Sequence, residues 1–442
     1  MNKLRLLALL AIGFASGPVS SALPADGPAD SPSSTSAHRQ VLDYKSKRLH
    51  VQTDLAPAEA EALYARLEET LKFAAKYWGR DPRGQIECYV VEDLDNWSDA
   101  ELPHRLARVI VSGVGGATVP RAVGTGSRTR NVPTVFASSR PGVAEHEIVH
   151  AYCTQTFGST GPEWYREGMA EMVVRGCTRE SGVQCSREQF ASLRIGKGTT
   201  VQQILSVGTT GRQISAALKL MMDDPAHDGH HVSSAAWTQR DSDNVVQARD
   251  EYLRSWAFCY MLLHNPNYAK RFRTLGKQFV TKQPRAFDEV FAAVRDEINF
   301  EYSFLLEHVA EGYRIDLCRW DWRTRFRPLD LGRSHKTRVV AARGFQASGL
   351  SVVAGARYTY QADGRWSMSA DANDTDADGC VGNSGRLVGV VMDAFELSAP
   401  LLLGRHGSFE APTSGRLYLR CNDPWNEVAD NAGQIAVTFR SP

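Results

Sequence analysis

The sequence predicts an α+β protein in which a domain with a mixed sheet and a mainly helical second half precedes an all-β sandwich. Three observations predict this class. Residues 41–140 contain runs in which apolar and polar side chains alternate, as in half-buried strands, around one long amphipathic helix. Helical spacing of apolar residues dominates from residue 141 to about 315. After residue 327, short β-prone runs are separated by Gly, Asp, Asn and Ser.

Residues 1–22 have the composition of an export signal, with a basic start, an apolar core over 6–15 and small residues at 20–22. The apolar core is too short to span a bilayer. Residues 23–40 are rich in Pro, Ser, Ala and Asp, so they cannot bury enough apolar surface to order themselves, and we interpret them as a linker. A secreted or periplasmic location is therefore expected.

Strands and one helix are expected between residue 41 and residue 140. Residues 48–53 and 85–91 alternate apolar and polar side chains with the period of a strand. Between them, apolar residues at helical spacing predict a helix with Pro57 in its first turn. Two further strands are expected at about 109–119 and 132–138.

The segment His146-Glu-Ile-Val-His150 has the pattern H-E-x-x-H and lies in a stretch with helical apolar spacing. Residues four apart lie on one face of a helix, so both imidazoles can reach the same metal ion. Glu147 lies about a third of a turn away, where it can hold a water molecule beside the metal. A zinc ion lowers the pKa of such a water, and a neighbouring carboxylate can accept its proton. The alternative is a surface helix with two solvated histidines.

A second motif follows after a spacer of sixteen residues, in the stretch Trp164-Tyr-Arg-Glu-Gly-Met-Ala-Glu171, which we expect to be a helix. A catalytic zinc ion takes three protein ligands and keeps one position open, so Glu167 is the expected third ligand. Glu171 lies four residues later on the same face, where it can accept a hydrogen bond from a ligating histidine. The simpler interpretation of Glu167 is an exposed helix carboxylate.

H-E-x-x-H followed by W-x-x-E-G-x-A-E resembles the gluzincin clan of metallopeptidases, and most closely the secreted proteins with a peptidase-MA-like domain. The resemblance covers roughly residues 41–310. It implies zinc as cofactor, with the following roles: His146, His150 and Glu167 as ligands, Glu147 as general base, and Glu171 as an outer carboxylate that orients a histidine.

The same resemblance implies an electrophile that stabilises the oxyanion, and Tyr252 is the candidate. Tyr252 and Trp256 are also spaced as a helical packing pair, which is the competing interpretation. The aminopeptidases of the clan carry a strand whose glutamate binds the amino terminus of the substrate. Residues 115–119, Gly-Gly-Ala-Thr-Val, contain no carboxylate at the corresponding place, so internal cleavage is expected.

Residues 417–424 and 430–433 resemble the end of the calcium-dependent galactophilic (LecA-like) lectins, in a likeness that covers roughly residues 335–442. The resemblance implies a calcium site at Asp423, Asp430 and Asn431, whose oxygen ligands suit that ion. It also implies carbohydrate as a possible ligand of this domain. Segments rich in Asp and Asn also form simple turns, and this alternative stays open.

Eight cysteines in an exported chain favour disulfides, because the compartment is oxidising. Proximity favours Cys177 with Cys185, which closes a short loop, and Cys380 with Cys421, which lie in one expected domain. Free buried thiols are the alternative.

The 51 Lys and Arg residues balance 50 Asp and Glu residues, giving a formal net charge of +1. No whole-chain field would recruit nucleic acid or a membrane surface, so neither is an expected partner. We divide the mature chain into a zinc metallopeptidase-like domain, residues 41–327, and a lectin-like β-sandwich, residues 328–442.

The expected function is hydrolysis of peptide bonds in a peptide or protein substrate by zinc-activated water, with Glu147 as general base. The alternative is a secreted carbohydrate-binding protein whose zinc domain is structural or inactive. The presence of Glu147 favours the enzyme, because a closed structural site needs no base and takes a fourth protein ligand.

Overall fold

The computed structural model describes residues 11–12, 39–123, 130–175, 186–223, 232, 237–281, 285–369 and 374–440. Most of the expected export signal and linker therefore lies outside the described residues. The chain divides into two compact units, which we describe separately. Unit 1 comprises residues 1–176, 202–260 and 273–286, and unit 2 comprises residues 177–201, 261–272 and 287–442. Within the described ranges, no helix is long and apolar enough to cross a membrane.

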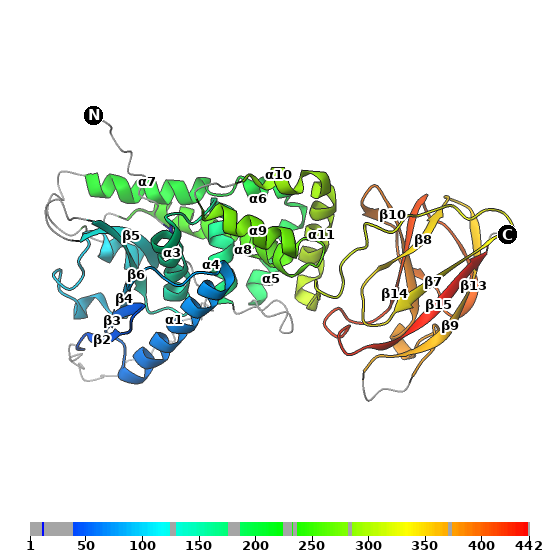
Figure 1. The fold of residues 1–442 in the computed structure, drawn as a ribbon, viewed down its shortest axis with the longest axis horizontal. Helices are drawn as coiled ribbons and strands as arrows, with labels where there is room; N and C mark the ends of the chain where they lie inside the picture. Colours follow the sequence, from blue (N-terminus) through cyan, green and yellow to red (C-terminus); the bar gives the residue numbers. More distant parts are fainter. Residues whose placement is uncertain are drawn as a thin grey trace, which may run out of the picture. The chain divides into compact units, whose positions relative to one another are not determined.

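In the described part of unit 1, a mixed six-stranded sheet has the order β1-β5-β6-β4-β3-β2 (Figure 1). The strands β3, β4 and β6 are parallel, whereas β5 runs antiparallel to β6. Their bounds are Ala11–Ile12 (β1), Leu42–Lys45 (β2), Leu49–Thr53 (β3), Ile86–Val91 (β4), Gly116–Val123 (β5) and Arg130–Ser138 (β6). A mixed sheet with many helices agrees with the α+β class.

The expected helix between the first strands is α1, Pro57–Trp78, which has Pro57 in its first turn and ends at Gly79 in the left-handed region. The strand expected at about 109–119 is only partly correct. Residues 107–114 are helical, and β5 begins only after Gly115, whose φ is 101°. The apolar residues at 109–111 and 114 are buried, and the periodicity of so short an apolar run cannot distinguish a helix from a strand.

Helices form most of the chain between residues 143 and 308. The helix α3, Val143–Phe157, packs on strands β4, β5 and β6 and against α1 and α4, so nearly all of its side chains are buried. The others are α4 (Glu163–Val174), α5 (Arg187–Ile195), α6 (Val201–Leu205), α7 (Thr209–Asp223), α8 (Gln239–His264), α9 (Ala269–Phe279), α10 (Phe287–Phe291) and α11 (Arg295–His308).

The described residues of unit 2 form two antiparallel sheets with the strand orders β11-β10-β14-β8 and β13-β9-β15-β7, and β12 pairs with β10. Figure 1 labels the longer strands of both sheets. Their inward side chains share one core, which includes Trp366, Leu387 and Ile435. The strands are β7 (Ser334–Val340), β8 (Gln346–Val352), β9 (Arg357–Ser367), β10 (Leu387–Asp393), β11 (Glu396–Leu397), β12 (Leu401–Leu402), β13 (His406–Glu410), β14 (Gly415–Cys421) and β15 (Ala432–Arg440).

The expected disulfide between Cys380 and Cys421 is wrong, because both thiols are free. Cys380 is exposed, whereas Cys421 is buried with its sulfur 3.6 Å from the Met368 sulfur, so the two side chains lie in different environments. The other proposed pair, Cys177 and Cys185, lies outside the described residues. No described cysteine forms a disulfide.

Candidate metal centre

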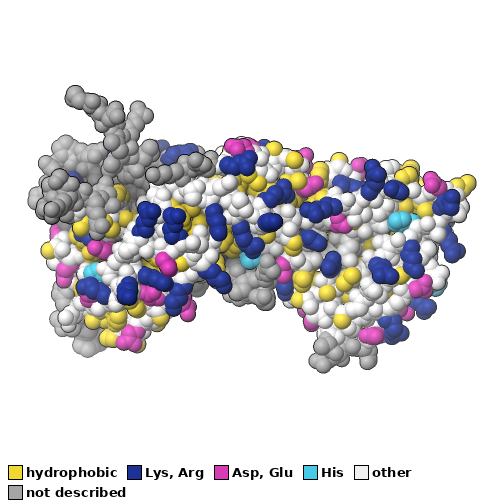
Figure 2. Space-filling view, in the orientation of Figure 1, with side chains coloured by type: hydrophobic (Ala, Val, Ile, Leu, Met, Phe, Trp, Pro, Cys, Tyr) yellow, Lys and Arg dark blue, Asp and Glu magenta, His cyan; other side chains and the backbone are white. Residues whose placement is uncertain are grey.

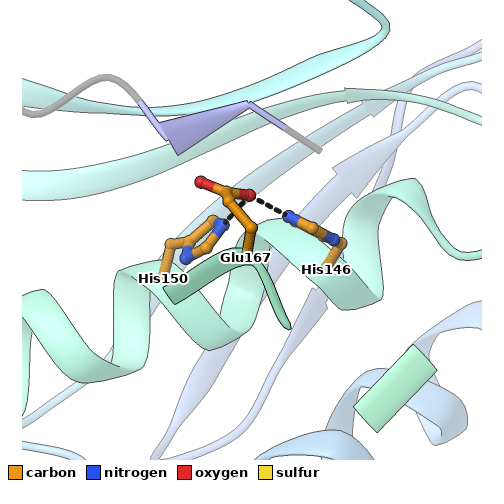
Figure 3. Close-up of side chains that lie close together, drawn as sticks. All are labelled: His146, His150 and Glu167. Atoms are coloured by element: carbon orange, nitrogen blue, oxygen red, sulfur yellow. Dashed lines mark hydrogen bonds and ion pairs between the residues drawn. The ribbon is translucent and has the colours of Figure 1, made fainter. Parts of the chain in front are cut away.

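The two motif helices bring His146, His150 and Glu167 together inside unit 1 (Figure 3). The histidines lie one turn apart on α3, and Glu167 comes from the neighbouring helix α4. The side chains are buried, and their potential ligand atoms all lie within 4.8 Å of one another. Glu167 Oε2 is 3.1 Å from His146 Nε2 and 3.4 Å from His150 Nε2.

These separations and atoms fit a zinc ion. Ligand atoms about 2.0–2.1 Å from a tetrahedral zinc lie about 3.3 Å apart, close to the spacing between Glu167 and each imidazole. Two imidazole nitrogens and one carboxylate oxygen also form a ligand set that catalytic zinc sites use. In the described part of the chain, Glu147 Oε1 is buried without a hydrogen-bond partner, and His150 Nε2 has no well-oriented hydrogen bond beyond its 3.4 Å contact with Glu167, so both atoms fit a site for a metal ion and a water molecule.

His146 lies between two carboxylates. Its Nε2 faces Glu167, and its Nδ1 is 3.1 Å from Glu171 Oε1, the contact that the sequence predicted for a ligand-orienting carboxylate. Burial opposes the charged form of His146, but the hydrogen bonds with both carboxylates outweigh it and raise its pKa to about 10. Burial lowers the pKa of His150 to about 4. Metal binding would therefore release a proton from His146.

Glu147 is fully buried beside strand β5. Thr118 Oγ1 lies 2.9 Å from Glu147 Oε2 and 2.8 Å from the Glu147 carbonyl oxygen, so its hydroxyl proton is shared between two acceptors. Burial raises the pKa of Glu147 to about 8. Sequence reasoning missed Thr118, although it is a polar residue in the otherwise apolar run that the sequence had placed near the site.

Two arginines that bond to the carboxylates of the centre were not predicted from the sequence. Arg166 is buried, and its Nε donates to Glu167 Oε1 over 2.6 Å while its other end pairs with Glu163. Arg175 pairs with Glu171 Oε2, at 3.0 Å from Nε. Burial alone would raise the pKa of Glu167, but Arg166 and the histidines hold it well below its usual range. A signal existed, since Arg175 follows Glu171 by one helical turn.

Tyr252, the proposed electrophile, lies on α8 with its side chain buried in the core of unit 1. Its phenol interacts electrostatically with Glu167 and Arg166, and burial raises its pKa well above the usual value. Its packing role is therefore evident. Its catalytic role stays a prediction.

The outer edge of β5 carries an extended segment. Ala11 pairs with Thr118 and Ile12 with Ala117 in an antiparallel arrangement. The edge of β5, the strand whose Thr118 bonds to Glu147, therefore pairs with an extended backbone. The segment contacts α3 as well.

The predicted calcium ligands are only partly brought together. Asp423 and Asn431 are buried, and they bond to Ser384 Oγ and the Ala341 carbonyl oxygen respectively, whereas Asp430 is exposed. Burial raises the pKa of Asp423. Among the described residues, Asp423 Oδ2 and Asn431 Oδ1 have no hydrogen-bond partner although they are buried.

Comparisons with known proteins leave the family open. No protein-family model matches the chain, and no curated protein matches it. Among solved structures, the chain is similar to one described as "EclA N-terminal domain; PllA-like lectin". The two are 22% identical over 24% of this chain and 96% of that chain, with a TM-score of 0.21. At this TM-score the likeness decides neither fold nor function.

Proposed function

We propose that this protein is a secreted zinc-dependent peptidase of the gluzincin type. One observation carries the proposal: Glu167, from a different helix, places a carboxylate oxygen 3.1 and 3.4 Å from the two histidine nitrogens of H-E-x-x-H. A surface helix with two solvated histidines does not account for this convergence, because all three side chains are buried. Buried ionisable groups in such an arrangement are typical of functional sites.

A bound zinc ion would polarise the scissile carbonyl and lower the pKa of a water molecule beside it. Glu147 is the group that would take the proton of that water and deliver it to the leaving amine. Thr118 holds one of its carboxylate oxygens, and the other oxygen is free of hydrogen bonds among the described residues. A pKa of about 8 lets Glu147 both accept and release a proton near neutral pH.

The substrate proposed for this site is an extended peptide bound to the edge of β5. The pairing of Ala11 and Ile12 with this strand supports the proposal, since an extended backbone fits there in antiparallel register. No carboxylate lies in residues 115–119 to bind an amino terminus, so we propose internal cleavage rather than release of single amino-terminal residues.

The test uses purified mature protein, its zinc content and the digestion of a peptide library with and without a chelator. We expect about one zinc ion per chain and chelator-sensitive internal cleavage. The variant Glu147→Gln should retain zinc and lose turnover by at least about 100-fold, the contribution of a general base. A His146→Ala, His150→Ala double variant that still binds zinc would contradict the ligand assignment. A zinc-loaded protein that cleaves no peptide would favour the structural or inactive domain.

A second candidate function belongs to the sandwich of unit 2, where we propose that Asp423 and Asn431 bind calcium. Their two buried oxygens without partners favour this, because a buried acceptor normally finds a hydrogen bond or an ion. Asp423 also lines a cavity of about 1230 Å³ whose walls include Phe304 and Trp425. Aromatic walls beside a calcium ion would suit a carbohydrate.

Calcium should raise the melting temperature of the full chain, because a ligand selective for the folded state stabilises it. The shift should disappear in Asp423→Asn and persist in Asp374→Asn, a control at an exposed position. An equal shift in both variants would exclude this site.

A further inference from the structure

We infer that Arg166 is a positioning residue of the metal centre: it engages one oxygen of Glu167, so that Glu167 binds zinc through its other oxygen alone. The inference rests on the proposed zinc function and deepens it. A carboxylate that bound through both oxygens would fill a position that a catalytic zinc keeps open for water or substrate.

The two oxygens of Glu167 have different partners. Oε2 lies 3.1 and 3.4 Å from the imidazole nitrogens, whereas Oε1 accepts a hydrogen bond from Arg166 Nε over 2.6 Å (Figure 3 shows the histidine side). A charge-assisted hydrogen bond of this length is among the strong interactions of a protein interior. Rotation of Glu167 toward two-oxygen binding would break it and leave a buried guanidinium nitrogen without its acceptor.

Arg166 itself is held from its far side. Its terminal nitrogen pairs with Glu163, one turn earlier on α4. Gly208 and Gly211 bring the backbone at the start of α7 close to that carboxylate: a Cβ placed on Gly211 would lie 2.7 Å from Glu163 Oε1, and one on Gly208 would lie 2.6 Å from its Cγ. Glu163 therefore packs beside this backbone and pairs with the guanidinium.

The other carboxylate that contacts His146 has the same arrangement. Glu171 Oε1 faces His146 Nδ1, and Glu171 Oε2 pairs with Arg175. Each carboxylate thus directs one oxygen to the centre and gives the other to an arginine, which is Arg166 within α4 for Glu167 and Arg175 directly after α4 for Glu171. Because both carboxylates share this arrangement, we assign the arginines to orientation rather than to charge balance alone.

The experiment measures zinc coordination by X-ray absorption and zinc affinity by competition with a chelator, using the full chain. The variants are Arg166→Met, Arg166→Lys and Glu163→Gln. Arg108→Met is the matched control, because Arg108 also binds a carboxylate and two carbonyl oxygens, at Asp99, Leu94 and Trp97. Arg166→Met should add about one oxygen to the zinc coordination shell and weaken zinc binding by about 10- to 100-fold. The two milder variants should show smaller changes in the same direction.

The outcomes separate this inference from the proposed function. Wild-type protein that binds no zinc defeats the proposed function before any variant is compared. The role of Arg166 is overturned if the wild type binds zinc and the folded Arg166→Met variant has the same zinc coordination and zinc affinity as Arg108→Met. If Arg166→Met does not fold, the variants Arg166→Lys and Glu163→Gln test the inference instead. The inference is overturned if both variants keep the zinc coordination and zinc affinity of the wild type.

Discussion

At the residue scale, the chemistry of the candidate centre depends on neighbouring side chains that orient the proposed base and ligands through hydrogen bonds. Glu147 shows this most directly, since burial raises its pKa to about 8 while the hydrogen bond from Thr118 acts to lower it. The positive charge of His146 also acts to lower this pKa. A general base needs a pKa near the operating pH, so the groups around Glu147 should influence the pH range of activity.

Replacing Thr118 by Val should lower kcat/KM by about tenfold, because the base loses the hydrogen bond that orients it. The sign of the pH effect follows from the lost interaction. Removal of a hydrogen bond that lowers the pKa of Glu147 raises that pKa, so the acidic limb of the pH profile should move to higher pH. Zinc content should stay at the wild-type level.

The measurement is kcat/KM of Thr118→Val across pH, with Ser112→Ala as a control, because the exposed Ser112 hydroxyl donates to the Arg108 carbonyl oxygen of its own helix. An acidic limb that stays in place, or moves to lower pH, would contradict the role assigned to Thr118.

At the element scale, α4, the helix that carries Glu167, packs closely on α8 through a glycine. α4 lies so close to α8 that a Cβ on Gly168 would come within 2.5 Å of the Ser255 carbonyl oxygen and 2.6 Å of Cys259 Sγ. Gly168 follows Glu167 directly, which gives the glycine of the second motif a packing role.

Gly168→Ala should therefore push α4 away from α8 and destabilise the protein by about 1–3 kcal/mol, the usual cost of overpacking a core. The same displacement should weaken zinc binding, because Glu167 moves with the helix. Denaturant unfolding and chelator competition measure the two effects. Gly158→Ala serves as a control for glycine replacement, since its φ of 82° is strained for alanine but nothing lies within 4 Å. Gly158→Ala should lower the stability of the protein without weakening zinc binding. Equal zinc affinity in Gly168→Ala and Gly158→Ala would contradict the packing role of Gly168.

At the scale of the whole molecule, stability is distributed over two units, each with a buried ionic group. On the face drawn in Figure 2, Lys and Arg side chains are spread widely, and a smaller share of Asp and Glu side chains lies among them. Inside unit 2, Glu301 of α11 is buried and accepts hydrogen bonds from four donors. They are Asn265, Asn267, Tyr268 and Trp322. These contacts connect α11 with the segments on either side of it in the chain.

Burial raises the pKa of Glu301 above its ordinary value despite these donors. The folded protein therefore binds this proton more tightly than the unfolded chain does. The contribution of Glu301 to stability is therefore greatest below its pKa in the unfolded chain, and it falls as the pH rises through its higher pKa in the folded protein. Glu301→Gln should remove this slope.

The variant should also lose about 1–3 kcal/mol of stability, because an amide group presents donors where the carboxylate accepted four hydrogen bonds. Urea unfolding followed by tryptophan fluorescence between pH 4.5 and 7 measures both effects. Glu307→Gln, at an exposed position on the same helix, is the control. An unchanged slope in Glu301→Gln would contradict the assignment.

The sequence by itself determined what depends on local periodicity. The strands at 49–53 and 86–91, the helix that starts at Pro57 and the placement of His146 and His150 on one helix face all follow from spacing within a few residues. Glu167 could be proposed as their partner because its own motif supplies the right chemistry at a distance that a loop can span.

Only the tertiary structure decided the features that depend on contacts between elements. The late start of β5 could not be read from the sequence, because the buried apolar residues at 109–111 and 114 fit the spacing of a helix and of a strand. Thr118 reaches Glu147 because α3 packs on β5, and Cys380 and Cys421 lie in different environments although the chain order favoured their pairing. Such relations join residues tens of positions apart, so they depend on how the folded elements pack, which spacing along one segment does not encode.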